Sequence, residues 1–137
     1  MARKTTTGIV FEQSVGLALQ HGGFQTSFQE EVGTRLGGGK HMVDIVATKG
    51  SQKILVSLKW QQTSGTAEQK VPYEFLCLAS ALQQDPTITG AYLVLGGNGW
   101  TKRDFFVDDL ASMISGMHDV VVIEGNDFIA KANAGTI

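Results

Sequence analysis

Two charged residues stand inside otherwise apolar segments near the middle of the chain. Asp44 lies within the apolar run 43–46, and Lys59 follows the run 54–58, in which Ser57 is the one polar residue. A charged side chain in an apolar strand costs free energy unless it is paired or coordinated. We therefore take Asp44 and Lys59 as the first candidates for catalytic chemistry, with a simple cross-strand ion pair as the alternative.

The segments that carry these residues are predicted to form a β-hairpin. Residues 41–48 and 52–60 have the composition of strands, and residues 49–51 between them are typical of a turn. Strand side chains alternate between the two faces of a sheet. Ser57 and Lys59 should therefore share one face. Because the two strands of the hairpin are neighbours, the carboxylate of Asp44 and the ammonium group of Lys59 can lie in one pocket.

The rest of the chain alternates between helical and strand patterns, which predicts an α/β fold. Helices are expected at 8–20 (capped by Thr7), 71–84 (with Pro72 in the first turn) and 101–115 (capped by Thr101), strands at 24–32, 91–95 and 120–123, a flexible loop at 33–40, and a last helical turn or two after Asn126. Three meandering strands followed by a helical crossover predict a mixed central sheet of about five strands flanked by helices. We expect one domain spanning residues 1–137.

With its helices and strands in this order along the chain, the protein resembles the PD-(D/E)XK nuclease superfamily, whose signature is an Asp on the second strand and an acid-x-Lys on the third. The matching residues are Asp44 and the tripeptide Ser57-Leu58-Lys59. Val43 stands where the family has Pro, and Ser57 stands where it has an acid. The resemblance covers roughly residues 8–97 and implies a restriction-endonuclease-like core, of the compact homing or restriction type with a Ser-x-Lys variant.

Some restriction enzymes of this superfamily carry Ser-x-Lys and recruit the missing acid from the following helix. Glu74 fits that role, and Glu68 is the nearer but weaker candidate. Two further motifs agree with the family. The first helix carries Gly8-x-x-x-Glu12, and the second carries Gln69-x-x-x-Tyr73, as in RecB-like members.

The resemblance implies a metal-dependent endodeoxyribonuclease that hydrolyses DNA phosphodiester bonds. Mg²⁺, for which Mn²⁺ can substitute, prefers oxygen ligands and uses one or two carboxylates. Asp44 would be the central ligand, with Glu12 and Glu74 completing the shell directly or through water. The backbone carbonyl of Leu58 is a further ligand by analogy with the family.

The same resemblance assigns roles to the two residues of the Ser-x-Lys motif. Lys59, kept charged by the nearby carboxylates, would orient the attacking water and stabilise the developing charge on the phosphate. Ser57 would position a neighbour through a hydrogen bond. Together with Asp44 and Glu12, these residues form the expected catalytic set.

Polar and basic residues around the hairpin are expected to contact DNA. Hydroxyls, amides and cationic side chains suit phosphate oxygens. The candidates are Arg35, Lys40, Gln62, Thr63, Ser64, Gln69, Lys70 and Tyr73. The partner would be double-stranded or branched DNA, and because a minimal nuclease must cut both strands, we expect a homodimer or homotetramer.

Several of these residues also have ordinary structural interpretations. Glu12 and Glu74 can be solvent-facing helix residues, and Gln69 with Tyr73 can be a helix-surface pair. His41 should point away from Asp44 in a regular strand, so we interpret it as non-catalytic. The other functions left open are a Holliday-junction or branched-DNA resolvase, a catalytically inactive DNA-binding protein on the same fold, and an unrelated α/β binding module.

The composition sets the remaining limits. The 137 residues carry a formal net charge of −2, which excludes a highly basic histone-like protein. The one cysteine, Cys77, excludes an intramolecular disulfide and a Cys-rich zinc site. The chain has no apolar run long enough to span a membrane, and residues 1–7 lack the apolar core of a secretory signal. We expect a cytoplasmic protein encoded by a bacterium or a phage.

Overall fold

The structure, a computed structural model, describes residues 6–114 and 119–137. Its elements are α1 (Thr6–His21), β1 (Gln25–Thr34), β2 (Lys40–Lys49), β3 (Gln52–Trp60), α2 (Ala67–Gln84), β4 (Gly90–Gly96), α3 (Arg103–Asp108), a 3₁₀ turn (Ala111–Met113), β5 (Val120–Glu124) and α4 (Gly125–Asn133). None of the helices in these two ranges combines the length and the hydropathy needed to cross a membrane.

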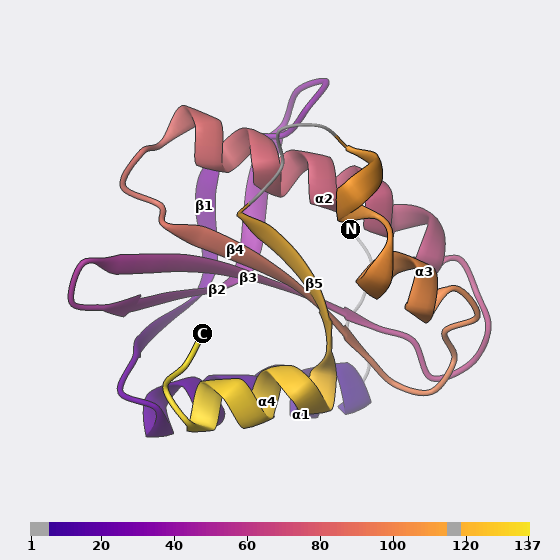
Figure 1. Ribbon diagram of the computed structural model, residues 1–137, viewed down its shortest axis with the longest axis horizontal. Helices are drawn as coiled ribbons and strands as arrows, with labels where there is room; N and C mark the ends of the chain where they lie inside the picture. Colours follow the sequence, from indigo (N-terminus) through magenta and orange to yellow (C-terminus); the bar gives the residue numbers. More distant parts are fainter. Residues whose placement is uncertain (1–5, 115–118) are drawn as a thin grey trace.

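The five strands form one mixed sheet in the order β1-β2-β3-β4-β5. The pairs β1–β2 and β2–β3 are antiparallel, whereas β3–β4 and β4–β5 are parallel. A two-residue turn at Gly50 and Ser51 joins β2 to β3, and Gly50 adopts a φ of 60° that suits glycine. The parallel pairs require crossovers, which α2 and α3 provide (Figure 1). The α/β fold and the mixed sheet flanked by helices are therefore confirmed.

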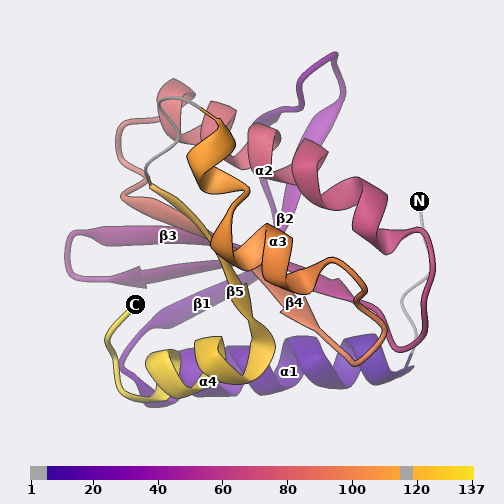
Figure 2. The ribbon, with the colours of Figure 1, turned by 45° about the vertical axis from the view of Figure 1, so that its right-hand side comes forward.

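The sheet separates two apolar clusters, one on each face. On one face, Phe75 and Leu78 of α2 pack with Phe106 of α3 against the sheet. On the other face, Val15 of α1 and Phe128 of α4 pack against the opposite side of the same strands. Figures 1 and 2 show α2 and α3 above the sheet and α1 beside α4 below it. Each face is therefore covered, which explains the near-continuous apolar run of β4.

Strand β2 departs from regular alternation at Asp44. Val43 packs with the α2 cluster, and Val46, three residues later, packs with the same cluster, while Ile45 belongs to the α1 cluster. The pairing of β2 with β3 ends at Ile45, opposite Val56. The two strands therefore separate at Asp44, and this break opens the sheet at the residue that the sequence marks as the central acid.

The starts of the first two helices differ from the sequence prediction. α1 begins at Thr6, so Thr7 lies inside the helix rather than capping it, and α2 begins at Ala67, so Pro72 lies beyond the first turn. The cause at α2 is a distant partner, because the backbone N–H of Ala67 donates to Oε1 of Gln61 at 3.1 Å. A side chain six positions upstream satisfies the helix start, which local capping rules do not consider.

The third helix is shorter than the predicted span 101–115, and Thr101 does not cap it with its own side chain. The carboxylate of Glu68 instead accepts hydrogen bonds from the backbone N–H groups of Thr101 and Lys102. The helix ends at Asp108 and a 3₁₀ turn follows, while Ser115, the predicted end, lies outside the described residues.

The last helix is longer than the predicted turn or two. Glu124 caps it, because its Oε2 accepts hydrogen bonds from the backbone N–H groups of Asn126 (2.9 Å) and Asp127 (3.2 Å). The loop at 33–40 is likewise shorter than predicted, since β1 continues to Thr34 and β2 begins at Lys40.

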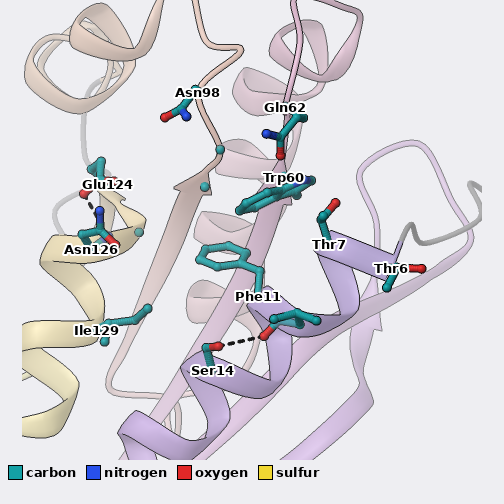
Figure 3. A pocket seen from close by; sticks show the side chains of 14 residues that line it. Thr6, Thr7, Phe11, Ser14, Trp60, Gln62, Asn98, Glu124, Asn126 and Ile129 are labelled. Carbon is teal, nitrogen blue, oxygen red and sulfur yellow. Dashed lines mark hydrogen bonds between the residues drawn. The ribbon is translucent and has the colours of Figure 1, made fainter.

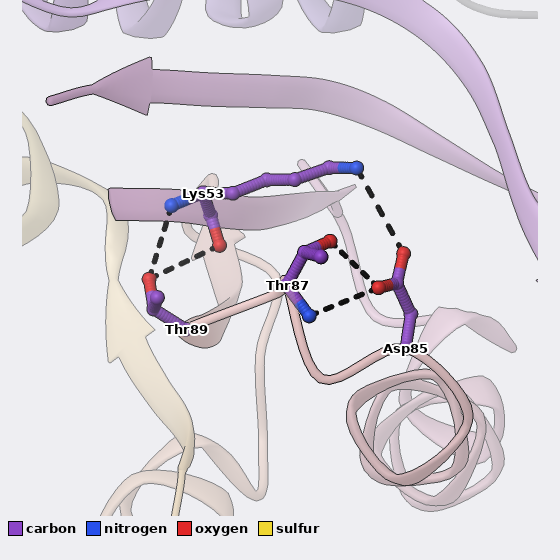
Figure 4. Close-up of polar contacts among 4 residues, drawn as sticks. All are labelled: Lys53, Asp85, Thr87 and Thr89. Atoms are coloured by element: carbon purple, nitrogen blue, oxygen red, sulfur yellow. Dashed lines mark hydrogen bonds and ion pairs between the residues drawn. The ribbon is translucent and has the colours of Figure 1, made fainter. Parts of the chain in front are cut away.

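The crossover from α2 to β4 is held in place by four polar side chains (Figure 4). Asp85 accepts hydrogen bonds from the backbone N–H and the hydroxyl of Thr87, at 3.0 and 2.6 Å. The hydroxyl of Thr89 accepts from the backbone N–H of Lys53 at 3.1 Å and donates to its carbonyl at 3.2 Å. The start of β4 is thereby fixed beside β3, which sets the register of the strand that carries Lys59.

The close approach of β4 to two aromatic rings generates a stability prediction. A Cβ added at Gly96 would lie 2.6 Å from Phe11 and 2.9 Å from Trp60. We expect Gly96→Ala to lower the free energy of unfolding by about 1–3 kcal/mol, because the rings must shift. Chemical denaturation measures the effect. Gly65→Ala is the matched control, because its Cβ would have no neighbour nearer than 3.8 Å, and an equal loss in both variants would contradict the packing argument.

Candidate active site

Two carboxylates from different elements meet at one amide group. Glu12 lies on α1 and Asp44 lies on β2, and both accept a hydrogen bond from Nε2 of Gln29 on β1, at 2.9 and 3.3 Å. The second carboxylate oxygen of Asp44 accepts from the backbone N–H of Leu58 at 2.7 Å. The structure therefore brings Glu12 and Asp44 together as predicted, and it fixes Asp44 against the residue that precedes Lys59.

The position of Asp44 follows from the break in β2. Where β2 and β3 separate, the N–H of Leu58 has no partner strand opposite it in the β2–β3 register, and the carboxylate of Asp44 takes that place. A hydrogen bond that a carboxylate accepts from a backbone N–H is charge-assisted and stronger than a neutral one. The same bond that completes the ladder therefore orients the central acid.

A second cluster lies on the α2 face of the sheet. Glu74, whose side chain is buried, pairs with the buried His41, with 3.1 Å between His41 Nε2 and Glu74 Oε2. Burial alone would raise the pKa of Glu74, but the hydrogen bond from His41, the charge of Lys59 and the hydroxyl of Ser57 outweigh it, so its pKa lies below the ordinary value. Glu74 is therefore a carboxylate at neutral pH and interacts with both polar residues of the Ser-x-Lys motif.

Two predictions about these residues can now be compared with the structure. Ser57 and Lys59 share the α2 face, because Val56 and Leu58, which alternate with them along β3, pack with the α1 cluster on the other face. His41 points away from Asp44, as the alternation of the strand predicts, because it lies on the α2 face with Val43, whereas Asp44 contacts Gln29 on the Glu12 side of the sheet. Its contact with Glu74 was not predicted. The histidine therefore positions a predicted site residue.

The three predicted carboxylate ligands do not form one group. Within residues 6–114 and 119–137, no three His, Cys, Asp or Glu side chains lie close enough to hold a metal ion together. Glu12 and Asp44 meet at Gln29, whereas Glu74 is engaged with His41. The oxygen pair of Glu12 and Asp44 fits a hard divalent cation, which uses one or two carboxylates and retains several waters.

The weaker candidate for the missing acid has another structural role. Glu68 is bound to residues 101 and 102, and its hydrogen bonds there hold its pKa below the ordinary value, with the Thr101 hydroxyl as the largest cause. It joins the start of α2 to the start of α3 and does not face the Ser-x-Lys motif through these contacts.

The predicted DNA-contacting residues lie in two loops and on the first turns of α2. Gln62, Thr63 and Ser64 are exposed in the loop after β3, and Gln69 and Lys70 are exposed on α2. Lys40 lies 3.9 Å from the carboxylate of Glu31, and both side chains are exposed. The remaining two residues, Arg35 and Tyr73, lie together on the α2 side.

Tyr73 connects α2 to the loop between β1 and β2. Its hydroxyl donates a hydrogen bond to the carbonyl of Leu36, and Cys77 raises its pKa while the charge of nearby Arg35 acts in the opposite direction. The tyrosine side chain therefore fixes the glycine-rich loop that carries Arg35, in addition to the DNA contact predicted for it.

A cavity of about 510 Å³ lies on the opposite, α1 side of the sheet, at the carboxyl ends of β3, β4 and β5. Phe11 and Trp60 pack against each other along one wall, tilted by 44° with 5.3 Å between their ring centroids, and Asn98 and Asn126 line the rim with amide groups (Figure 3). The loop after β4 closes this side, because Gln61 Nε2 donates to the carbonyl of Gly99 at 2.8 Å. Glu12, Asp44 and Lys59 are not among the residues that line this cavity, although Phe11 and Trp60 precede and follow two of them in the sequence.

Sequence reasoning missed Gln29, His41 and the structural role of Gln61. Gln29 lies in the predicted strand 24–32, and nothing in its residue type distinguishes it from the exposed polar residues around it. His41 carries one available signal, because a buried acid such as Glu74 needs a buried donor. Gln61 stands at the start of a run of polar residues after β3, and its residue type gives no sign that it is buried and bonded to two segments.

Comparison with known proteins agrees with this architecture. The family model described as a PD-(D/E)XK nuclease superfamily domain matches residues 3–134. The fold is similar to the crystal structure of an XisH family protein from Nostoc punctiforme PCC 73102, with a TM-score of 0.57 and 22% identity over 87% of this chain and 94% of that one. It is also similar to AF1548, described as a protein of unknown function, with a TM-score of 0.54 and 12% identity over 84% of this chain.

The chain spans 58% of the length of AF1548, and it matches no curated protein. Both structural similarities lie at low sequence identity, so they concern the fold alone. The family match is independent of them and covers both the hairpin and α1.

The buried pair of Glu74 and His41 generates a prediction on stability and pH. Glu74→Gln should lower the free energy of unfolding at pH 7 by about 1–3 kcal/mol, because charge-assisted hydrogen bonds are lost. Since the folded-state pKa of Glu74 lies below the ordinary value of 4.5, its contribution is complete above that pH and is lost as the pH falls through the folded-state pKa.

Urea denaturation of the parent and Glu74→Gln between pH 7 and pH 3 measures this difference. The gap between the two curves should narrow as the solution becomes acidic. Glu31→Gln serves as the control, because the Glu31 side chain is 53% exposed and should show little effect. A gap that stays constant down to pH 3 would contradict the role of the ionised carboxylate.

Proposed function

The chain belongs to the PD-(D/E)XK nuclease superfamily, and on that premise we propose that it is a metal-dependent endonuclease that hydrolyses DNA phosphodiester bonds. The observation that carries the proposal is the convergence of Glu12 and Asp44 on one nitrogen atom, beside the strand that carries Lys59. Carboxylate oxygens that come together from two elements are suitable ligands for Mg²⁺ or Mn²⁺. A pair of carboxylates used only for stability would not need to meet.

Asp44 and Glu12 would hold the cation, together with the carbonyl of Leu58 and water. The bound cation supplies Lewis-acid polarisation of a phosphoryl oxygen and makes a water molecule more readily ionised. Asp44 is oriented for this role by the N–H of Leu58, so its carboxylate does not have to be ordered when substrate binds.

Lys59 would stabilise the negative charge that develops on the phosphate and orient the attacking water. Glu74 lies near the Lys59 ammonium group and interacts with Ser57, so the buried carboxylate positions both residues of the motif. This arrangement deepens the prediction that Glu74 compensates for the acid missing at position 57. It does so through the motif's side chains, and a water-mediated contact to the cation stays part of the proposal.

DNA would approach the hairpin side of the protein. Residues 1–84 hold eight bases and six acids, whereas residues 85–137 hold three bases and seven acids. Arg35 and Lys70 supply exposed or half-exposed cations on this side, and Gln62, Thr63 and Ser64 supply amides and hydroxyls for phosphate oxygens. Cutting both strands of a duplex would require two copies of the site, so we propose that the protein acts as a homodimer or homotetramer, in the cytoplasm of a bacterial or phage-infected cell.

The cavity at the carboxyl ends of β3, β4 and β5 favours a second candidate, a resolvase of Holliday junctions or other branched DNA. Aromatic rings and side-chain amides suit an unpaired base, which offers a π face and hydrogen-bonding edges. Phe11, Trp60 and Asn98 provide such groups on the wall of the cavity. Cleavage rates on plasmid DNA and on a synthetic four-way junction distinguish the two candidates.

Asp44→Asn is expected to abolish cleavage of both DNA substrates in Mg²⁺ while the protein stays folded. The carboxamide retains an acceptor for the Leu58 N–H but loses the charge that holds the cation. Gel assays with circular dichroism measure both properties, and the exposed Asp109→Asn is the control. If the folded variant cuts at the parental rate, the active-site assignment is wrong. If the parent binds DNA but never cuts it, the protein is a catalytically inactive DNA-binding member of the superfamily.

Lys59→Ala is expected to lower the cleavage rate by about 10²-fold or more, as for the loss of a group that stabilises the transition state. Mn²⁺ affinity should change little, because an ammonium group is not a metal ligand. Single-turnover rates and Mn²⁺ titration by calorimetry test the two parts. Lys53→Ala is the matched control on the same strand. Intact turnover at saturating Mn²⁺ with a large loss of Mn²⁺ affinity would contradict the role.

A further inference from the structure

Gln29 has a backbone conformation that a residue with a side chain rarely adopts. Its φ is 53°, in the left-handed region, and among the described residues it is the one non-glycine with positive φ. The left-handed conformation brings Cβ close to the following carbonyl oxygen and is less favourable than that of an ordinary strand residue. Its neighbours Phe28 and Glu30 keep their pairing with β2, opposite Ile45 and Val43, so the distortion is confined to this single residue.

The distorted backbone directs the side chain toward the candidate metal ligands. Nε2 of Gln29 lies 2.9 Å from Oε1 of Glu12 and 3.3 Å from Oδ1 of Asp44. Ionised carboxylates only accept hydrogen bonds, so the NH₂ group and not the carbonyl of the amide must face them. The amide thus occupies the point at which the two carboxylates converge.

A neutral amide at this point solves an electrostatic problem. Two carboxylates that lie close together repel each other, and a third carboxylate would increase the repulsion whenever no cation is bound. An amide presents donors on one side and an acceptor oxygen on the other. Rotation of its terminal torsion by half a turn exchanges the NH₂ group for the oxygen without moving the backbone.

We propose that Gln29 is a third ligand of the divalent-cation site and that its amide group rotates by half a turn when the cation binds. This inference rests on the proposed metal-dependent function. Without the cation, the NH₂ group bridges Glu12 and Asp44, and with the cation, Oε1 joins their oxygens as an uncharged ligand. Side-chain amide carbonyls are established ligands of hard divalent cations. Gln29 thereby supplies a third ligand oxygen, because no third His, Cys, Asp or Glu side chain among the described residues joins Glu12 and Asp44.

The surroundings of Gln29 permit this exchange. The side chain is exposed, while Glu12 and Asp44 are half-buried, so solvent and a hydrated cation reach the amide from outside. Glu74 is held by His41 in the α2 cluster and does not compete for the same place. The cation, the two acids and the amide would therefore meet at the open side of the break in β2.

Mn²⁺ binding in the absence of DNA tests the proposal, with isothermal calorimetry and thermal melting as readouts. Gln29→Met keeps the length of the side chain and removes both polar atoms, and it should weaken Mn²⁺ binding by about 10-fold or more. Gln29→Gly, which also relieves the left-handed backbone, should weaken it similarly while remaining folded. Gln25→Met, at an exposed position on the same strand, should bind as the parent does.

Gln29→Glu separates a ligand from a simple brace. A carboxylate at this position should lower the melting temperature without metal, because three acids repel one another, and should bind Mn²⁺ at least as tightly as the parent. Gln25→Glu controls for the added charge.

Three outcomes are decisive. If Gln29→Met and Gln29→Gly bind Mn²⁺ as tightly as the parent or more tightly, Gln29 is only a brace and the proposal is overturned. If Mn²⁺ binding depends on Gln29 but the parent cuts no DNA, the proposal stands and the proposed function fails. If the parent cuts DNA and the Gln29 variants bind Mn²⁺ as the parent does, the proposed function stands and the proposal about Gln29 fails.

Discussion

The hydrogen bond from the Leu58 N–H to the Asp44 carboxylate is the interaction on which the site depends. It forms where β2 and β3 part, and it replaces a ladder bond with a charge-assisted one. Because one oxygen of Asp44 is held by the sheet, the other is left to face Gln29 and the α1 side. The local separation of the two strands thus orients the carboxylate of Asp44 at the edge of the packed core.

The two sides of the sheet divide the chemistry between them. Glu12, Gln29 and Asp44 form an oxygen-rich point reached from α1 and β1, whereas Glu74 and His41 form a buried ionic pair beneath α2. A buried pair is expensive to desolvate and is retained when it fixes a geometry. Here it fixes the surroundings of Ser57 and Lys59. Helix α2 therefore contributes to the site by positioning residues of β3, not by supplying a ligand to the cation.

The mixed sheet and the order of its elements along the chain were predictable because the alternation in the hairpin and the apolar run of β4 are strong, local patterns. Helix ends were not, because Gln61 and Glu68 satisfy the starts of α2 and α3 from distant positions. The pairing of Asp44 with Glu12 followed from family motifs on separate elements. Gln29 could not be found, since a left-handed backbone on an exposed strand residue leaves no trace in residue type or periodicity.

The central claim is that the cation site lies at the break between β2 and β3, with Asp44 and Glu12, and not Glu74, as the carboxylates that bind the cation directly. A crystal structure with Mn²⁺, with anomalous scattering at the manganese absorption edge, tests it most directly. The account predicts an anomalous peak within bonding distance of Asp44 and Glu12. A peak bound by Glu74 and His41, with none at Asp44, would contradict it.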